Sequence, residues 1–223
     1  MKTDIFDSRT LFDLEQTAAG ELFASCSAPW EVLPRLHGFL ETWTPPGDFE
    51  QIDERVWVGR GTILAAGAVI HGPAVIGRNC ELRSGVLIRG DAMIGDDVVL
   101  GNSAEVKNAL LFNRVQAPHY SYIGDSVLGF RAHLGAGVVL SNVKVTPGAI
   151  RIRLPEGGFV ESGLQKLGAL IGDEAEIGAN SVLCPGTVIS RRSIVYPLTV
   201  VRGFVPPESI LKSDGSLTRR TDA

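Results

Sequence analysis

Three side chains that can carry positive charge recur at a constant interval in the first half of the sequence. His71, Arg89 and Lys107 are each 18 residues from the next. Stacked like charges cost free energy unless an anion binds them, so this interval predicts a phosphate-binding column if the backbone keeps the three in register. The alternative is that the side chains spread into water, with acidic neighbours such as Asp91 and Glu105 offsetting their charge.

His119 is a candidate general base. It lies in the segment Pro118–Tyr122, twelve residues after Lys107. If it were close to Arg89 and Lys107, its protonated form would be disfavoured, and a neutral imidazole near pH 7 could accept a proton. The alternative is a structural histidine that is hydrogen-bonded at a corner.

The histidines give little support for a metal site. Four are present, and their spacing matches no usual set of metal ligands. His119 and His133 are the one pair worth testing, because they would come from neighbouring turns of the chain.

The element that would position these side chains is a six-residue repeat, which begins at Val58 and is closed by Phe112. A period of six fits neither an α-helix nor a simple hairpin. It is typical of a β-helix in which each hexad is a short strand and a corner, and three hexads form one coil. Positions 18 apart then stack about 4.8 Å from each other. The aliphatic positions are Val58, Leu64, Ile70, Ile76, Leu82, Ile88, Ile94, Leu100 and Val106.

The repeat slips once and then returns. The spacing is five residues from Ile123 to Leu128 and six to Leu134 and Leu140, and after a gap a second regular block begins at Ile171 and ends at Val201. Ordinary strands of a β-sandwich are the alternative, but they would not keep hexads in register over two blocks. We therefore expect a mainly β protein with a parallel β-helix over residues 47–207.

Residues 1–46 are expected to form a small helical cap. One amphipathic helix is predicted from Leu11 to Leu22, and a second follows Pro29 and is kinked or split at Pro34. The simplest arrangement places this pair over the open end of the β-helix, where it hides the edge strand. Residues 208–223 are expected to form a C-terminal tail, which from Lys212 onward is polar enough to be frayed.

An insertion over residues 143–167 interrupts the repeats. Apolar residues from Ile150 to Leu154 alternate with Arg151 and Arg153, and a Pro-Glu-Gly-Gly turn follows. This pattern predicts a β-hairpin that projects from one corner. Such loops on repeat proteins commonly carry function.

The composition limits the function classes. The chain has 223 residues, 26 glycines, 7% aromatic residues and a net charge of −4, which suits a solenoid and argues against a nucleic-acid surface. Cys80 and Cys184 fall inside hexads, as small core residues in a reducing compartment would. The first 20 residues lack the pattern of a signal peptide, and no apolar run is long enough to span a membrane, so we expect a cytoplasmic protein.

Four segments resemble the acetyltransferase domain of the bifunctional N-acetylglucosamine-1-phosphate uridyltransferase and the solenoids of sugar nucleotidyltransferases. The resemblance covers roughly residues 55–205. It implies a left-handed β-helix and a homotrimer with active sites between subunits. It also implies transfer of acetyl from acetyl-CoA to the amine of glucosamine 1-phosphate. The segments are Glu105–Asn108, Pro118–Gly129, Leu134–Gly137 and Ser141–Asn142.

The resemblance also implies roles for individual residues. Arg89 and Lys107 match the family's sugar-phosphate ligands, and His119 matches its general base. Tyr122 matches a phosphate or sugar contact, Asn142 matches an asparagine near the amine and the acyl carrier, and Lys166 matches a second lysine at the site. Ala179 and Pro197 match positions that line the pantetheine arm.

Two departures from the family pattern point to an altered pocket. His133 replaces an asparagine that holds the sugar and the reacting groups, and the family's Asn-Tyr-Asp-Gly run is replaced by residues 142–145 and a longer hairpin. In addition, no glycine-rich nucleotide-binding turn precedes the solenoid, so we do not expect nucleotidyltransferase activity.

The main hypothesis is thus an acyl-CoA-dependent acyltransferase that acts on a sugar 1-phosphate, with no metal in the chemistry. The alternative is a non-catalytic trimeric module that binds a sugar phosphate or a nucleotide sugar, or that partners a separate nucleotidyltransferase. A third, weaker hypothesis is a zinc site of the carbonic-anhydrase type on the same solenoid.

Overall fold

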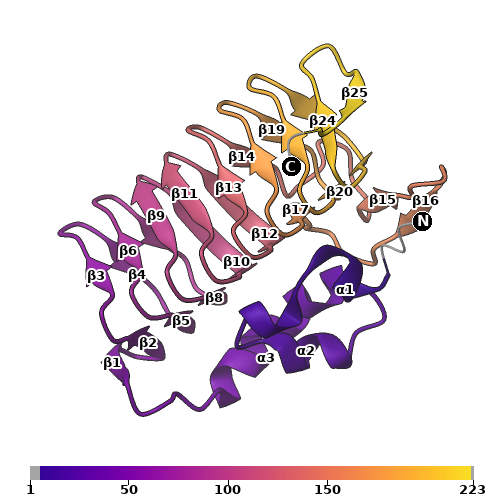
Figure 1. The fold of residues 1–223 in the computed structure, drawn as a ribbon. Helices are drawn as coiled ribbons and strands as arrows, with labels where there is room; N and C mark the ends of the chain where they lie inside the picture. The colour runs from indigo at the N-terminus through magenta and orange to yellow at the C-terminus, as the bar shows by residue number, and fades with distance from the viewer. Residues whose placement is uncertain (1–5, 222–223) are drawn as a thin grey trace.

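The computed structural model describes residues 6–221, and a solenoid of short parallel strands dominates it (Figure 1). Each complete coil contributes one strand to each of three faces. The chain passes from the first face, through a corner, to the next, so that residues one coil apart are paired in register on neighbouring parallel strands, as Val58 and Ile76 are. The predicted mainly β solenoid of hexapeptide repeats is confirmed.

The first face, here called the helix face, carries a strand of every coil. Its strands are β2 (Val56–Gly59), β5 (Ala74–Ile76), β8 (Ala92–Ile94), the second halves of β10 (Glu105–Leu111) and β12 (Tyr122–Leu128), then β17 (Ala169–Ile171), β20 (Thr187–Ile189) and β23 (Phe204–Val205). β1 (Phe49–Asp53) pairs antiparallel with β2 and so covers the starting edge.

The second face, here called the valine face, has mostly aliphatic side chains pointing outward. It contains β4 (Val69–Ile70), β7 (Leu87–Ile88), the first halves of β10 and β12, β14 (Val139–Leu140), β19 (Val182–Leu183) and β22 (Val200–Val201).

The third face forms a separate sheet. Its strands are β3 (Ile63–Leu64), β6 (Glu81–Leu82), β9 (Val99–Asn102), β11 (Gln116–His119), β13 (His133–Leu134), β18 (Glu176–Ile177), β21 (Ile194–Val195) and β24 (Ser209–Leu211).

The hexad residues fill the interior. Leu82, Ile88, Leu100 and Val106 are fully buried, and Cys80 lies in the same core. Burial raises the pKa of the Cys80 thiol to about 11, so it remains a protonated, apolar core group. The slip in the repeat is one short coil, since Val106 pairs with Ile123.

The N-terminal segment folds differently from the single helix that was predicted first. It forms α1 (Ser8–Leu11), the 3₁₀ turn η1 (Leu14–Gln16) and α2 (Gly20–Ala24). The backbone between them is bound to the solenoid, because Leu11 accepts a hydrogen bond from Asp173 and Gln16 accepts one from Asn113. A continuous helix would use those carbonyls internally. The second predicted helix is split as expected, into η2 (Pro29–Val32) and α3 (Leu33–Thr42).

These helices lie along the side of the solenoid and do not cover its open end (Figure 1). Buried Trp30, Leu36 and Leu40 pack in one cluster with outward-pointing residues of the helix face. Those residues are apolar in coil after coil, so the whole face must be covered. The expected end cap is therefore wrong in its position. The outward residues in the cluster include Val75, Met93, Leu110, Val127, Leu170 and Val188.

The insertion contains the predicted hairpin, β15 (Arg151–Arg153) paired antiparallel with β16 (Phe159–Glu161). The C-terminal segment is more ordered than the frayed tail that was expected. β24 continues the third face beyond residue 207, and β25 (Leu217–Arg219) pairs antiparallel with it. No helix among residues 6–221 has the length and apolar character needed to cross a membrane.

Candidate functional site

A polar cluster lies at the corner where the valine face turns into the helix face, here called the Lys107 corner. The Lys107 ammonium donates to both carboxylate oxygens of Asp125, at 3.0 and 3.3 Å. Asn108 donates to the same carboxylate at 2.8 Å, and the Asn142 amide is a third donor to it. Asp125 is only 3% exposed. A buried carboxylate therefore fixes one ammonium and two amides.

The sequence-based reasoning did not single out Asp125. Because this coil is one residue short, the slot above Lys107 holds Gly124, and Asp125 comes next in the turn. Its backbone has φ of 47°, which asparagine and aspartate tolerate better than most residues. The sequence did contain a signal for Asp125, because it is an acidic residue next to the cation column at the point where the repeat slips.

Arg89 stacks one coil below Lys107, as the 18-residue interval predicts, since its backbone N–H donates to Val106. Its guanidinium donates to Glu105 at 2.7 Å, and this bond together with the carboxylate charge raises the pKa of Arg89. Arg89 and Lys107, two of the three members of the predicted column, thus each have an acidic partner within the chain. The geometric stacking is present, whereas the uncompensated charge expected for a bare anion site is not.

Tyr122 and Asn142 join the same cluster. The Asn142 amide donates to the Tyr122 hydroxyl at 3.2 Å. Gly124 leaves room for both, because a Cβ there would lie 2.6 Å from the Tyr122 hydroxyl and 2.8 Å from the Asn142 amide nitrogen. Lys166 is close along the backbone, since the next residue, Leu167, donates its N–H to the Asn142 carbonyl. The Lys166 side chain itself is exposed.

His119 lies at the opposite edge of the valine face, here called the His119 corner. It ends β11 on the third face, where it pairs with Asn102. The partner of Lys107 is Gly124, so five residues of chain, up to about 16 Å, separate the two positions. The structure does not bring His119 beside Lys107 or Arg89 within one chain. Its imidazole is exposed and makes no hydrogen bond within the described chain.

Ala179 and Pro197 share the His119 corner. A Cβ on Gly135 would lie 2.7 Å from the Ala179 nitrogen, and one on Gly178 would lie 2.4 Å from the Pro197 nitrogen, so these corner segments stack closely. The chain from Gly135 to Gly137 connects them to His119, whose carbonyl accepts from the Gly137 N–H. The predicted carrier-lining residues therefore lie along the same edge as His119.

His133 belongs to neither corner. It points outward from β13 on the third face, and its Nδ1 lies 2.7 Å from a carboxylate oxygen of Glu176. That hydrogen bond raises the pKa of His133. The pair lies in a surface hollow with Asp97, Arg114, Gln116 and Arg131. Within residues 6–221, no group of three or more histidine, cysteine or acidic side chains is arranged to hold a metal.

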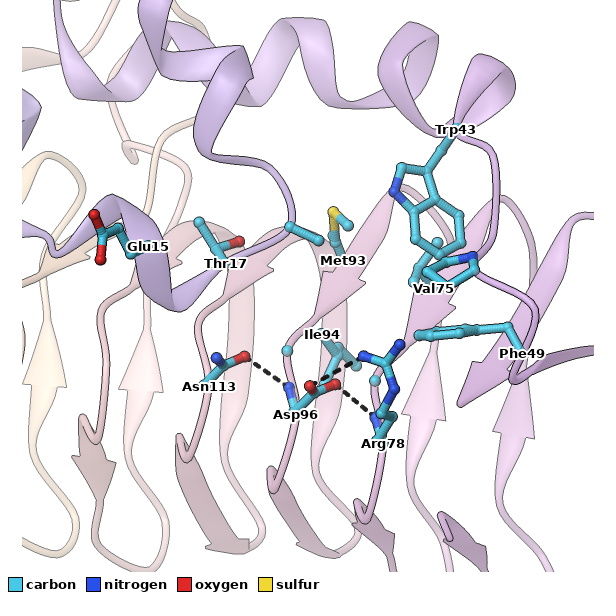
Figure 2. A pocket seen from close by; sticks show the side chains of 14 residues that line it. Glu15, Thr17, Trp43, Phe49, Val75, Arg78, Met93, Ile94, Asp96 and Asn113 are labelled. Carbon is cyan, nitrogen blue, oxygen red and sulfur yellow. Dashed lines mark hydrogen bonds and ion pairs between the residues drawn. The ribbon is translucent and has the colours of Figure 1, made fainter. Parts of the chain in front are cut away.

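A separate cavity of about 240 Å³ lies between the N-terminal segment and the helix face (Figure 2). Arg78 lines this cavity and makes several polar contacts there. The guanidinium donates to both oxygens of Asp48 at 2.6 and 2.9 Å and to Asp96 at 3.2 Å, and it lies 4.9 Å from the ring centre of Phe49. These contacts join the start of the solenoid to its next coils. None of the site residues predicted from sequence lines this cavity.

The comparisons with known proteins agree with the fold. The family model for bacterial transferase hexapeptide (six repeats) matches residues 55–90 and 73–108. The putative uncharacterized acetyltransferase YaiX of Escherichia coli is 35% identical over 158 residues, which are 70% of this chain and 68% of that protein. The chain belongs to the hexapeptide-repeat transferases. The prediction of an enzyme of this transferase family is thus confirmed.

This hexapeptide-repeat transferase also resembles longer proteins over its solenoid. A bifunctional sugar-1-phosphate nucleotidylyltransferase/acetyltransferase of Sulfurisphaera tokodaii is 34% identical over 102 residues, which are 46% of this chain and 25% of that protein. Among solved structures, a mutant perosamine N-acetyltransferase of Caulobacter crescentus, in complex with CoA and GDP-perosamine, is 18% identical. That match covers 72% of this chain and 57% of the other, with a TM-score of 0.43.

Proposed function

We propose that this hexapeptide-repeat transferase moves an acyl group from acyl-CoA to an amine or hydroxyl of a sugar. The observation that carries the proposal is the Lys107–Asp125–Asn142 cluster, in which the buried Asp125 carboxylate holds polar donors in fixed positions at a corner of the solenoid. A buried polar network that is fully hydrogen-bonded is preorganised to orient a polar ligand. The name of the E. coli relative, an acetyltransferase, supports acetyl as the group transferred.

In this proposal His119 is the general base. It takes a proton from the sugar amine or hydroxyl as the nucleophile attacks the thioester carbonyl. The tetrahedral intermediate collapses, the carbon–sulfur bond breaks, and the thiolate of CoA receives the proton back from the imidazolium. Tyr122 and Lys166 would orient the sugar, and backbone amides near Asn142 would bind the oxyanion. Ala179 and Pro197 would line the path of the pantetheine arm. His133, which points outward from the third face, has no role in this proposal.

The separation of His119 from the Lys107 corner supports a site that is completed between copies of the chain. A cyclic trimer about an axis parallel to the solenoid brings one edge of the valine face of one copy against the other edge of the next. The valine face and the His119 corner expose apolar residues that such a contact would cover, including Leu198 at 73% and Val200 at 64%.

The test is acyl-CoA-dependent release of thiol with a panel of amino sugars and sugar phosphates. We expect at least one acceptor to raise the rate above background. His119→Ala is expected to reduce kcat by about 100-fold to 10,000-fold. The control is His37→Ala, which changes an exposed histidine of α3 that is hydrogen-bonded to Asp91. If no sugar raises the rate and His119→Ala still binds sugar ligands normally, the protein is the alternative, a non-catalytic binding module.

Within this function, we propose a sugar 1-phosphate as the acceptor. Glu105 accepts from one terminal nitrogen of Arg89, and the guanidinium has five N–H donors, so donors remain for a phosphate. The wild-type enzyme should then prefer the phosphorylated acceptor over the parent sugar by at least tenfold in kcat/KM. Arg89→Met should remove most of that preference. An equal or higher kcat/KM for the parent sugar would reject the phosphate while leaving acyl transfer in place.

A further inference from the structure

A second cavity, of about 320 Å³, lies between the hairpin and the last coils of the solenoid. We call it the hairpin pocket. Its lining is basic and contains no carboxylate. The residues that line it are Lys144, Arg151, Arg153, Phe159, Cys184, Pro185, Gly186, Arg202 and Gly203.

The hairpin is held in place by its apolar side. Ile150 and Ile152 are fully buried in the cluster that also contains Val188 of the helix face. Because side chains alternate along a strand, Arg151 and Arg153 lie on the other side. A Cβ on Gly203 would lie 2.8 Å from the Arg153 side chain, so this arginine packs directly on the last coil.

The positive charge in the pocket is uncompensated. None of Lys144, Arg151, Arg153 and Arg202 forms an ion pair with a carboxylate within residues 6–221. Lys144 donates to the Ala149 carbonyl at 2.8 Å, which leaves its charge unbalanced. Glu161 is opposite Arg151 in the hairpin register, yet Arg151 lies instead over the Phe159 ring, at 4.9 Å.

We propose that the hairpin pocket binds a nucleotide that carries at least two phosphate groups. Four convergent cations exceed what one monophosphate neutralises, whereas a diphosphate offers enough oxygens and charge for them. Phe159 is 57% exposed, and an exposed ring beside an arginine is a stacking surface for a base. The hairpin itself thereby has a role in ligand binding.

The pocket lies on the same edge of the solenoid as the Lys107 corner. Leu183 pairs with Val201, so the residues that follow this pair, Cys184 and Arg202, stack on each other at the same corner. Leu140 pairs with Leu183, which joins that column to the coil of Asn142. A diphosphate bound here would therefore lie further along the edge that carries the proposed acceptor site. The inference concerns binding only and does not depend on acyl transfer.

The test is isothermal titration of the full-length protein with ADP and with inorganic pyrophosphate. Both should bind, and raising the salt concentration should weaken both. The double variant Arg153→Ala/Arg202→Ala should weaken the binding of each ligand by about tenfold or more, since it removes charge-assisted hydrogen bonds to the phosphate groups. Phe159→Leu should weaken ADP by about tenfold and leave pyrophosphate unchanged.

Matched variants separate binding from folding and from catalysis. Arg60→Ala removes an exposed arginine at the start of the solenoid and should bind like the wild type. The double variant Arg153→Lys/Arg202→Lys should restore much of the affinity, and circular dichroism should be the same for all variants. His119→Ala should bind ADP normally, so failure of the proposed function would leave this result unaffected.

The biological source of the diphosphate is distinguished with further ligands. Stronger binding of CoA than of a UDP-sugar would identify the acyl donor as the source, and the reverse would identify a nucleotide-sugar acceptor. Two results would overturn the proposal. One is the absence of saturable binding of ADP and pyrophosphate at millimolar concentrations, and the other is equal affinity in the double alanine variant and in Arg60→Ala.

Discussion

The Lys107 corner and the hairpin pocket lie along one edge of the solenoid and use their cations in opposite ways. At the Lys107 corner, Asp125 and Glu105 neutralise Lys107 and Arg89. In the hairpin pocket the four cations have no carboxylate partner within the described residues. A paired cation fixes geometry, whereas an unpaired cation attracts an anion. The comparison indicates that the first region positions ligand groups and that the second supplies charge.

Asp125→Ala provides the strongest test of this comparison. The change leaves the Lys107 ammonium and two amides without their common acceptor in a buried position, so the free energy of unfolding should fall by about 3 kcal/mol. Urea denaturation measures the loss. Arg202→Ala is the matched change in the hairpin pocket and should stay within about 0.5 kcal/mol of the wild type. Equal effects would mean that the two regions do not differ in this way.

Asp173 extends the comparison to a second buried carboxylate, at the junction with the N-terminal segment. It accepts from the Asp13 and Phe130 backbone N–H groups at 2.7 and 2.8 Å and pairs with Arg191 at 3.0 Å. Burial outweighs the arginine charge and raises the pKa of Asp173 from 3.8 to about 6. The partner of Asp173 is a guanidinium, whereas that of Asp125 is an ammonium, and burial disfavours the charged form of Asp173.

The expected consequence is a pH-dependent stability. A carboxyl whose pKa is raised on folding adds stability that is complete below pH 3.8 and is lost as the pH rises through about 6. Between pH 4 and 7 the wild type should lose roughly 2 kcal/mol of unfolding free energy relative to Asp173→Asn. Chemical denaturation at several pH values measures the difference. Parallel pH profiles, or a wild type that gains stability, would contradict the assignment.

His133 and Glu176 provide the smallest test, because both side chains are more than a third exposed. The hydrogen bond to Glu176 raises the pKa of His133, so its stabilisation is complete below the ordinary histidine value of 6.5 and is lost as the pH rises through the folded value. Solvent screening limits the effect to less than about 1 kcal/mol. The wild type should exceed His133→Gln in stability at pH 5.5, and the two should converge at pH 8. A difference that persists at pH 8 would show that packing, not charge, is responsible.

Part of the architecture was predictable because neighbouring residues encode it. The period of six defines strand, corner and coil, and the alternation around Arg151 and Arg153 defines the hairpin. The position of the N-terminal helices was predicted wrongly, at the open end of the solenoid, although a signal for the correct position was available. The outward residues of one face, such as Val75, Met93 and Leu110, are apolar, and only a covering layer along the side would bury them.

The sequence by itself determined the repeat, the stacking of Arg89 below Lys107 and the hairpin, because each depends on a fixed interval along the chain. Only the tertiary structure decided which groups meet across intervals that are not repeated. The short coil places Asp125 among Lys107, Asn108 and Asn142, and the width of the valine face separates His119 from them. Such contacts depend on the length of individual coils and turns, which a period alone does not specify.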